Sequence, residues 1–165
     1  MYFAEATTVN LTRALFRKLA LQFHPDRVGG DLETMKLINL AYEAKLASLD
    51  GEVSTGSDGK ERTYRYNQKV EHEAMAKVLD LLGLSIENVV VEMIGTWVWV
   101  SGDTKPAKEL LKEHGLRWHA KRTMWYWHVA GHRTRYNGHA SINDLRSYYG
   151  SREFEREAAG GLVVA

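Results

Sequence analysis

The first apolar pattern along the chain has the period of an amphipathic helix. Over residues 11–23, the apolar side chains fall within about 180° of arc at 100° per residue, and the three cations lie on the other arc. The apolar set is Leu11, Leu15, Phe16, Leu19, Ala20 and Phe23. A second run follows Asp31, a good N-cap, with apolar residues three or four positions apart. Its members are Leu32, Met35, Ile38, Tyr42, Leu46 and Leu49. Two matching stripes with a short connection predict an antiparallel helical hairpin.

Farther along the chain, helical and alternating patterns follow one another. The spacing predicts a helix over 67–82, then two strands around Gly95-Thr96, a pair that fits a two-residue hairpin turn. This turn sets a register in which Ile94 pairs with Trp97, Glu92 with Trp99 and Val91 with Val100. Three further elements complete the pattern. They are a helix over 105–114 capped by Asp103 or Thr104, a second hairpin over 116–120 and 124–129, and a last helix over 141–149 capped by Ser141.

These elements predict an α+β protein made of two small modules. We expect a helical module over 1–50, and a helix-ββ-α-ββ-helix module over 67–150 with a four-stranded, mostly antiparallel sheet. The segment 51–66 begins with a Gly- and Ser-rich stretch and predicts a flexible linker. The segment 151–165 predicts an accessory tail.

Composition narrows the class of protein. The chain has 165 residues, 44% of them hydrophobic and 26% charged, which is typical of a globular protein. It has no cysteine, which excludes disulfides, thiol catalysis and thiolate-bound zinc. No run approaches the ~20 apolar residues of a membrane helix, and the first ten residues lack the pattern of a secretory signal. We therefore expect a cytoplasmic protein that does not contact a membrane.

One motif is more specific than the rest. The sequence from Arg17 to Arg27 reads RKLALQFHPDR, so the tripeptide His24-Pro25-Asp26 follows a basic amphipathic helix. The segments 29–31 (GGD), 35–39 (MKLIN) and 41–43 (AYE) then follow. Together these features resemble the second and third helices of a J domain, the module of DnaJ-type co-chaperones, over residues 10–49. The short loop resembles the compact J domains of viral early antigens and of some phage or plasmid proteins.

The residues themselves explain how such a site would work. Pro25 fixes its own φ and biases His24 toward extended backbone, so that Asp26 would be presented as a rigid acceptor for a partner's arginine. A cationic helix face steers toward an acidic groove, and one apolar residue among the cations can act as an anchor. That face would consist of Arg13, Arg17, Lys18 and Leu21.

The resemblance implies a regulator that is not itself an enzyme. A J domain docks on a DnaK-type chaperone and stimulates its ATPase, so the partner-binding residues would be His24, Pro25, Asp26 and the cationic face, with no cofactor. The C-terminal module would bind a client or target. Two features depart from the family. Only ten residues precede the first predicted helix, so the usual first J-domain helix is expected to be shortened, rebuilt or absent. In addition, Gln22 stands where the family usually has a basic residue.

A second interpretation rests on charge and aromatic residues in the C-terminal module. Residues 105–135 carry eight Lys or Arg against two Glu, a local charge of +6, and all five tryptophans lie between 97 and 127. Bases can stack on aromatic rings while cations follow the phosphates, which favours single-stranded nucleic acid as the alternative partner. The alternative function is then a nucleic-acid-binding or inhibitor protein of a phage or mobile element that uses the segment 97–135. The candidate residues are Trp97, Trp99, Lys105, Lys108, Arg117, Lys121, Arg122, Arg133 and Arg135. An acidic protein surface or unfolded clients remain alternatives. Trp118, Trp125 and Trp127 are expected in the core, and the alternative for Trp97 and Trp99 is packing under the helix over 67–82.

The sequence offers little for catalysis or metal binding. Five histidines lie between 114 and 139, and His128 and His132 are four residues apart, but the segment between them reads as a strand end and a loop. There is no nucleophile-base arrangement, no phosphate-binding glycine loop and no pair of catalytic carboxylates. We therefore expect neither a metal site nor an active site.

Overall fold

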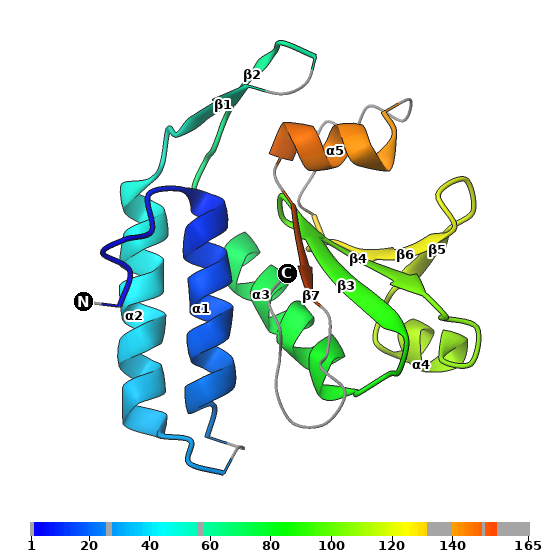
Figure 1. The fold of residues 1–165 in the computed structure, drawn as a ribbon, viewed down its shortest axis with the longest axis horizontal. Helices are drawn as coiled ribbons and strands as arrows, with labels where there is room; N and C mark the ends of the chain where they lie inside the picture. The colour runs from blue at the N-terminus through cyan, green and yellow to red at the C-terminus, as the bar shows by residue number, and fades with distance from the viewer. Residues whose placement is uncertain (1, 26–27, 56–57, 132–139, 150, 155–165) are drawn as a thin grey trace. The chain divides into compact units, whose positions relative to one another are not determined.

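The computed structural model describes residues 2–25, 28–55, 58–131, 140–149 and 151–154. Within these ranges, helices and an antiparallel sheet are both present, so the predicted α+β class is confirmed (Figure 1). The chain divides into two compact units. Unit 1 comprises residues 1–55 and 59–68, and unit 2 comprises residues 56–58 and 69–165.

Unit 1 is built on the predicted helical hairpin, α1 (Val9–Phe23) and α2 (Leu32–Ser48), which lie side by side (Figure 1). The side chain of Thr8 caps α1, accepting from the amide of Leu11 at 3.2 Å. Phe16 of α1 stacks on Tyr42 of α2 with ring centroids 4.0 Å apart, and Phe3 lies 5.9 Å from the same tyrosine. The segment before α1 thus packs on the hairpin through Phe3.

The apolar stripes of the hairpin are buried over most of their length. Phe16 and Ala20 of α1 are buried, as are the central stripe residues of α2, namely Met35, Ile38, Tyr42 and Leu46. The two predicted stripe residues nearest the helix starts, Leu11 and Leu32, are instead 45% and 53% exposed. Each belongs to the first turn or two of its helix.

The predicted flexible linker over 51–66 is wrong for much of its length. Strands β1 (Val53–Thr55) and β2 (Glu61–Thr63) form a two-stranded antiparallel ribbon. Backbone hydrogen bonds from Gly51 to Tyr64 and from Tyr64 to Glu52 extend the ribbon to the end of α2. The ribbon is short and mostly exposed, so its pairing rests on these ladder bonds and leaves little apolar pattern in the sequence.

Unit 2 contains a five-stranded antiparallel sheet in the order β5-β6-β4-β3-β7. The predicted four strands are present as β3 (Val89–Ile94), β4 (Trp97–Gly102), β5 (Arg117–His119) and β6 (Met124–Trp127). The Gly95-Thr96 turn gives the predicted register, with Ile94 opposite Trp97 and Glu92 opposite Trp99.

The segment 151–165 was predicted to be an accessory tail, and this is wrong for its first residues. Strand β7 (Ser151–Phe154) pairs antiparallel with β3 and becomes the fifth strand of the sheet. The remainder of that segment lies outside the described residues.

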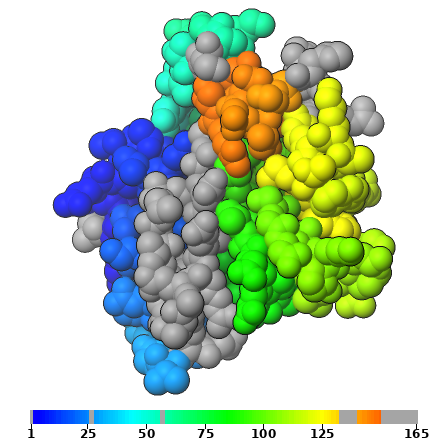
Figure 2. Space-filling view, turned by 45° about the vertical axis from the view of Figure 1, so that its right-hand side comes forward, coloured from blue at the N-terminus to red at the C-terminus, as the bar shows by residue number. Residues whose placement is uncertain are grey.

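Helices cover both faces of this sheet. One face carries Val91, Met93, Val98 and Val100, all buried, and is the face of α3 (Gln68–Gly83) and α4 (Lys108–Glu113). The ammonium of Lys77 on α3 lies 5.6 Å from the ring centroid of Trp127, which pairs with Val98 on this face. The other face lies under α5 (Ile142–Tyr149), which rests against the β5–β6 segment in Figure 2.

The ends of two unit 2 helices test the predicted caps. Ser141 caps α5 as predicted: its hydroxyl accepts from the amide of Asp144, whose carboxylate accepts from the Ser141 amide and hydroxyl. The helix predicted over 105–114 is present as α4, but its predicted start and the cap at Asp103 or Thr104 are wrong. Helix α4 begins at Lys108 after Ala107, which makes no side-chain cap.

Candidate partner-binding site

The connection between α1 and α2 carries the His24-Pro25-Asp26 motif. Helix α1 ends at Phe23, and His24 takes φ −59° and ψ 131°, the extended geometry that a following proline favours. The amide of Asp31 donates to the carbonyl of Phe23 at 3.1 Å, which joins the two ends of the connection. His24 is partly exposed and Pro25 is exposed, while Asp26 lies outside the described residues.

Asp31 fixes the far end of this connection. Its carboxylate accepts hydrogen bonds from the amides of Glu33 and Thr34, both at 3.2 Å, and from the Thr34 hydroxyl. The hydroxyl bond is the main cause of a lowered pKa at Asp31, since a bond to the charged form favours ionisation. The negative cap and the dipole of α2 reinforce each other, so the helix start is well defined.

The cationic face of α1 differs from the prediction. Lys18 is exposed and Leu21 is partly exposed, but Arg13 is only 5% exposed and Arg17 is fully buried. The guanidinium of Arg13 lies 5.9 Å from the ring centroid of Tyr64, which follows β2. The prediction that Arg13 and Arg17 offer a solvent-facing cationic surface is therefore wrong, and Lys18 is the cation of that set available to a partner.

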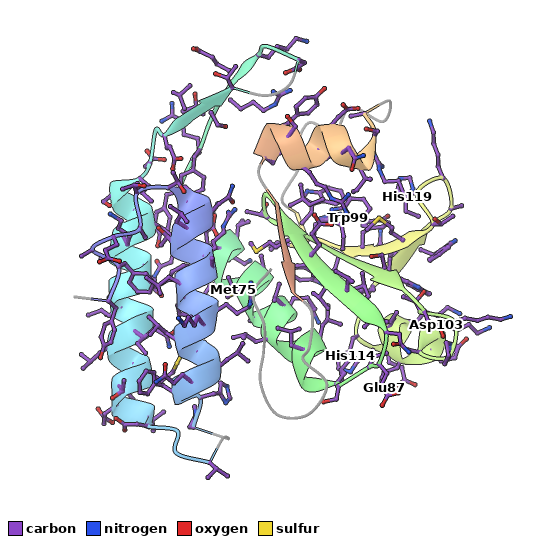
Figure 3. The ribbon with its side chains drawn as sticks, viewed as in Figure 1. Met75, Glu87, Trp99, Asp103, His114 and His119 are labelled. Atoms are coloured by element: carbon purple, nitrogen blue, oxygen red, sulfur yellow. The ribbon has the colours of Figure 1, made fainter. Side chains whose placement is uncertain are left out.

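The aromatic residues under α5 belong to the core and do not form an open platform. Trp99 is 1% exposed and forms a cluster with Ile94, Met124 and Leu145. Trp97 packs against this cluster and lies 4.4 Å, centroid to centroid, from His128. The prediction that Trp97 and Trp99 stack on nucleic-acid bases is wrong for Trp99, because α5 covers the face of the sheet on which Trp99 lies. Figure 3 shows Trp99 between the sheet and this helix.

Arg122 is also a structural residue. Its guanidinium lies 5.5 Å from the ring centroid of Trp99, donates to the carbonyl of Ala140 and lies 3.0 Å from Nε2 of His119. Burial lowers its pKa, because removal from water disfavours the charged form. Arg122 joins the β5–β6 turn to the start of α5, so it does not contribute to an open basic surface.

The tryptophan that does reach the surface is Trp118 on β5. It was predicted to be a core residue, but it is 47% exposed because β5 is the edge strand of the sheet. Its ring packs edge-on against Trp125, which is 5% exposed, with centroids 5.4 Å apart. Arg117 and Lys121 are exposed on either side of it along the chain, and Lys105 and Lys108 are exposed near the start of α4. Arg133 and Arg135 lie outside the described residues.

A buried ion pair under α5 was not predicted. Glu92 is 1% exposed, and its carboxylate accepts from Nε of Arg146 at 2.7 Å and from Nη2 at 2.8 Å. The strand alternation had placed Glu92 on the tryptophan face, and a carboxylate among aromatic residues is a signal that a cation must approach it. The chain position of that cation, 54 residues later, leaves no local signal.

A second polar cluster joins α3 to the end of α4. Asp80 Oδ2 lies 2.8 Å from Nδ1 of His114 and accepts from Nζ of Lys77 at 3.2 Å. Burial would raise the pKa of Asp80, but the hydrogen bonds from His114 and Lys77 and the lysine charge lower it overall. Lys77 also donates to the carbonyl of His114 at 3.0 Å, so the cluster ties the two helices together.

The structure offers no metal centre within its described part. No group of three or more His, Asp or Glu side chains is placed to hold an ion among those residues. Nδ1 of His128 lies 3.0 Å from the carbonyl of Val129, and His132 lies outside the described ranges. No described helix is both long and apolar enough to cross a membrane.

Comparisons with known proteins add no relative: no family model, no curated protein and no solved structure matches this chain.

Proposed function

We propose that the chain is a J-domain co-chaperone that docks on a DnaK-type chaperone and stimulates its ATPase. The observation that carries this proposal is the closed connection between α1 and α2, in which the Asp31 amide bonds to the Phe23 carbonyl and the His24-Pro25-Asp26 motif lies between them. When a partner orders it, a short connection with fixed ends loses less conformational entropy than a long connection with free ends. The chain would regulate a chaperone ATPase and would itself be no enzyme.

The docking surface in this proposal is smaller than a whole cationic helix face. Lys18 would steer toward an acidic groove, Leu21 would make an apolar contact, and Asp26 would accept from an arginine of the chaperone. Arg13 and Arg17 are left out because they are buried. Unit 2 would bind the client, and the proposal places the protein in the cytoplasm with its partner.

The test is single-turnover ATP hydrolysis by a DnaK-type chaperone with the 165-residue chain. We expect stimulation by the unaltered protein, loss of stimulation with His24→Gln or Asp26→Asn, and a partial loss with Lys18→Ala. Lys36→Ala on α2 is the matched control, since it also removes an exposed lysine of the same unit. Equal stimulation by all variants, or none by the unaltered chain, would reject the proposal.

Single-stranded nucleic acid is the second candidate partner, and one observation favours it. Trp118 is half-exposed, and its contact with Trp125 holds the ring in place; Arg117 and Lys121, which flank it along the chain, are exposed. A held aromatic ring and neighbouring cations are the minimal elements for stacking a base and neutralising phosphates. This surface is distinct from the one under α5 that the sequence suggested.

Titration with fluorescent single-stranded DNA at two salt concentrations tests the second candidate. We expect binding that weakens with salt and is reduced by Trp118→Ala, while Tyr2→Ala, a partly exposed aromatic of unit 1, leaves it unchanged. No saturable binding, or equal binding by Trp118→Ala, would reject single-stranded nucleic acid as a partner of this surface.

A further inference from the structure

Helix α2 is apolar on two sides, and unit 1 uses one of them. Met35, Ile38, Tyr42 and Leu46 are buried against α1 and the segment before it. On the other side, Leu37 is 58% exposed and Leu40 is 70% exposed, and Ala44 and Ala47 are exposed as well. At 100° per residue these four side chains lie within about 80° of arc, so they form one continuous strip, called here the outer strip.

An exposed apolar strip on a helix is a candidate interface, because ordinary surface helices carry charged residues there. We infer that the outer strip of α2 pairs with the same strip of a second copy of this chain, with the two helices antiparallel. The inference goes beyond the co-chaperone proposal and does not depend on it.

The arrangement of large and small residues argues for a second copy as the occupant. The two leucines lie toward the start of the helix and the two alanines toward its end. A two-fold axis at residue 42 places Leu40 of each copy opposite Ala44 of the other, and Leu37 opposite Ala47. Each large side chain thus meets a small one, as a self-complementary interface related by a two-fold axis requires.

One pair of opposite charges beside the strip fits the same register. The axis at residue 42 brings Lys36 of one copy opposite Ser48 of the other and close to Asp50, which is of opposite charge. Within one copy, Lys36 is paired at 2.8 Å with Glu33 on the surface, a bond that a second partner can share. Glu43 flanks the axis, and its carboxylate already accepts from Gln68 at 2.8 Å.

The size of the strip sets the expected strength. Two leucines and two alanines provide far less than the ~800 Å² per partner of a standard stable interface. The dimer should therefore be weak and in exchange with the monomer, and its population should rise with protein concentration.

The experiment is sedimentation velocity on the 165-residue chain over a roughly hundredfold concentration range. We expect the weight-average sedimentation coefficient to rise from the monomer value toward the dimer value. Leu40→Glu should hold the chain at the monomer value, whereas Leu11→Glu should not. Leu11 is a matched control, since it is an exposed leucine on α1 outside the strip. Circular dichroism checks that both variants keep their helices.

A second variant separates this register from general stickiness. Ala44→Leu fills the space into which Leu40 of the other copy packs, so it should weaken association by at least tenfold even though it makes the strip more apolar. Stronger association by Ala44→Leu would overturn the register. A monomer at all concentrations, or a dimer that survives Leu40→Glu, would overturn the inference and leave the strip to another partner.

Discussion

Removing the cation under α5 should destabilise unit 2 more than most surface substitutions can. Arg146→Met keeps much of the aliphatic stem but removes both hydrogen bonds to Glu92, whose carboxylate is 1% exposed. A buried charge left without its partner costs about 3–5 kcal/mol. Since the free energy of unfolding of a whole domain is about 5–15 kcal/mol, this one substitution should remove a large part of the stability of unit 2.

The assay can follow unit 2 alone, because all five tryptophans lie between residues 97 and 127. Urea unfolding monitored by tryptophan fluorescence should show a midpoint lower by about 1.5–2.5 M for Arg146→Met, taking an m-value of ~2 kcal/mol/M. Arg117→Met is the matched control. It removes an exposed arginine of the same unit and should change the stability by less than about 0.5 kcal/mol.

A double variant tests the electrostatic reason for the effect. In Glu92→Met/Arg146→Met, no charge remains buried, so the double variant should be more stable than Arg146→Met alone. The reasoning fails if Arg146→Met costs less than about 1 kcal/mol, or if removing Glu92 in addition makes the protein still less stable.

Three further outcomes follow from the local geometry. Gly102 has φ +95°, and a Cβ there would lie 2.3 Å from the Asn88 carbonyl oxygen. Gly102→Ala should therefore lower the urea midpoint clearly. Gly83→Ala should not, because a Cβ at Gly83 would have no atom within 4 Å. The pKa of Asp80 is lowered in the folded protein, so the ionised carboxylate stabilises the fold above its ordinary pKa of 3.8. This contribution is lost as the pH falls through the pKa of Asp80 in the folded protein. The acid-induced loss of stability, followed by tryptophan fluorescence, should therefore be smaller in Asp80→Asn. Asp31→Ala should lower the midpoint of thermal unfolding of the helices, followed by far-ultraviolet circular dichroism, and an unchanged melting curve would contradict its role as a cap.

Local features of the fold could be predicted because their causes are local. The Gly95-Thr96 turn fixes the register of β3 and β4 within two residues, and the side chains of Asp31 and Ser141 cap helices that begin directly after them. Alternation along β4 also placed Trp97 and Trp99 together on one face. In each case the deciding contacts span only a few residues of the chain.

The errors concern which surfaces other elements cover. Helical periodicity assigned Arg13 to the polar side of α1, but Tyr64, 51 positions later, lies over its guanidinium. Alternation cannot say that α5 covers Trp99, nor that Trp118 lies on an edge strand and stays half-exposed. Strand β7 has polar and charged residues at three of its four positions, so its pairing with β3 leaves no apolar pattern to read.

The two proposals for unit 1 use different helices, and their geometry links them. The outer strip lies on α2, whereas Lys18 and Leu21 lie on α1 and the connection with His24 precedes the start of α2. In an antiparallel α2 pair, the two connections lie at opposite ends of the pair, about 30 Å apart, because each α2 starts ten residues from the axis at residue 42. Two chaperones would then approach the dimer from opposite ends. The two sites act independently in this arrangement, so Leu40→Glu should abolish dimerisation and leave the chaperone stimulation per chain unchanged.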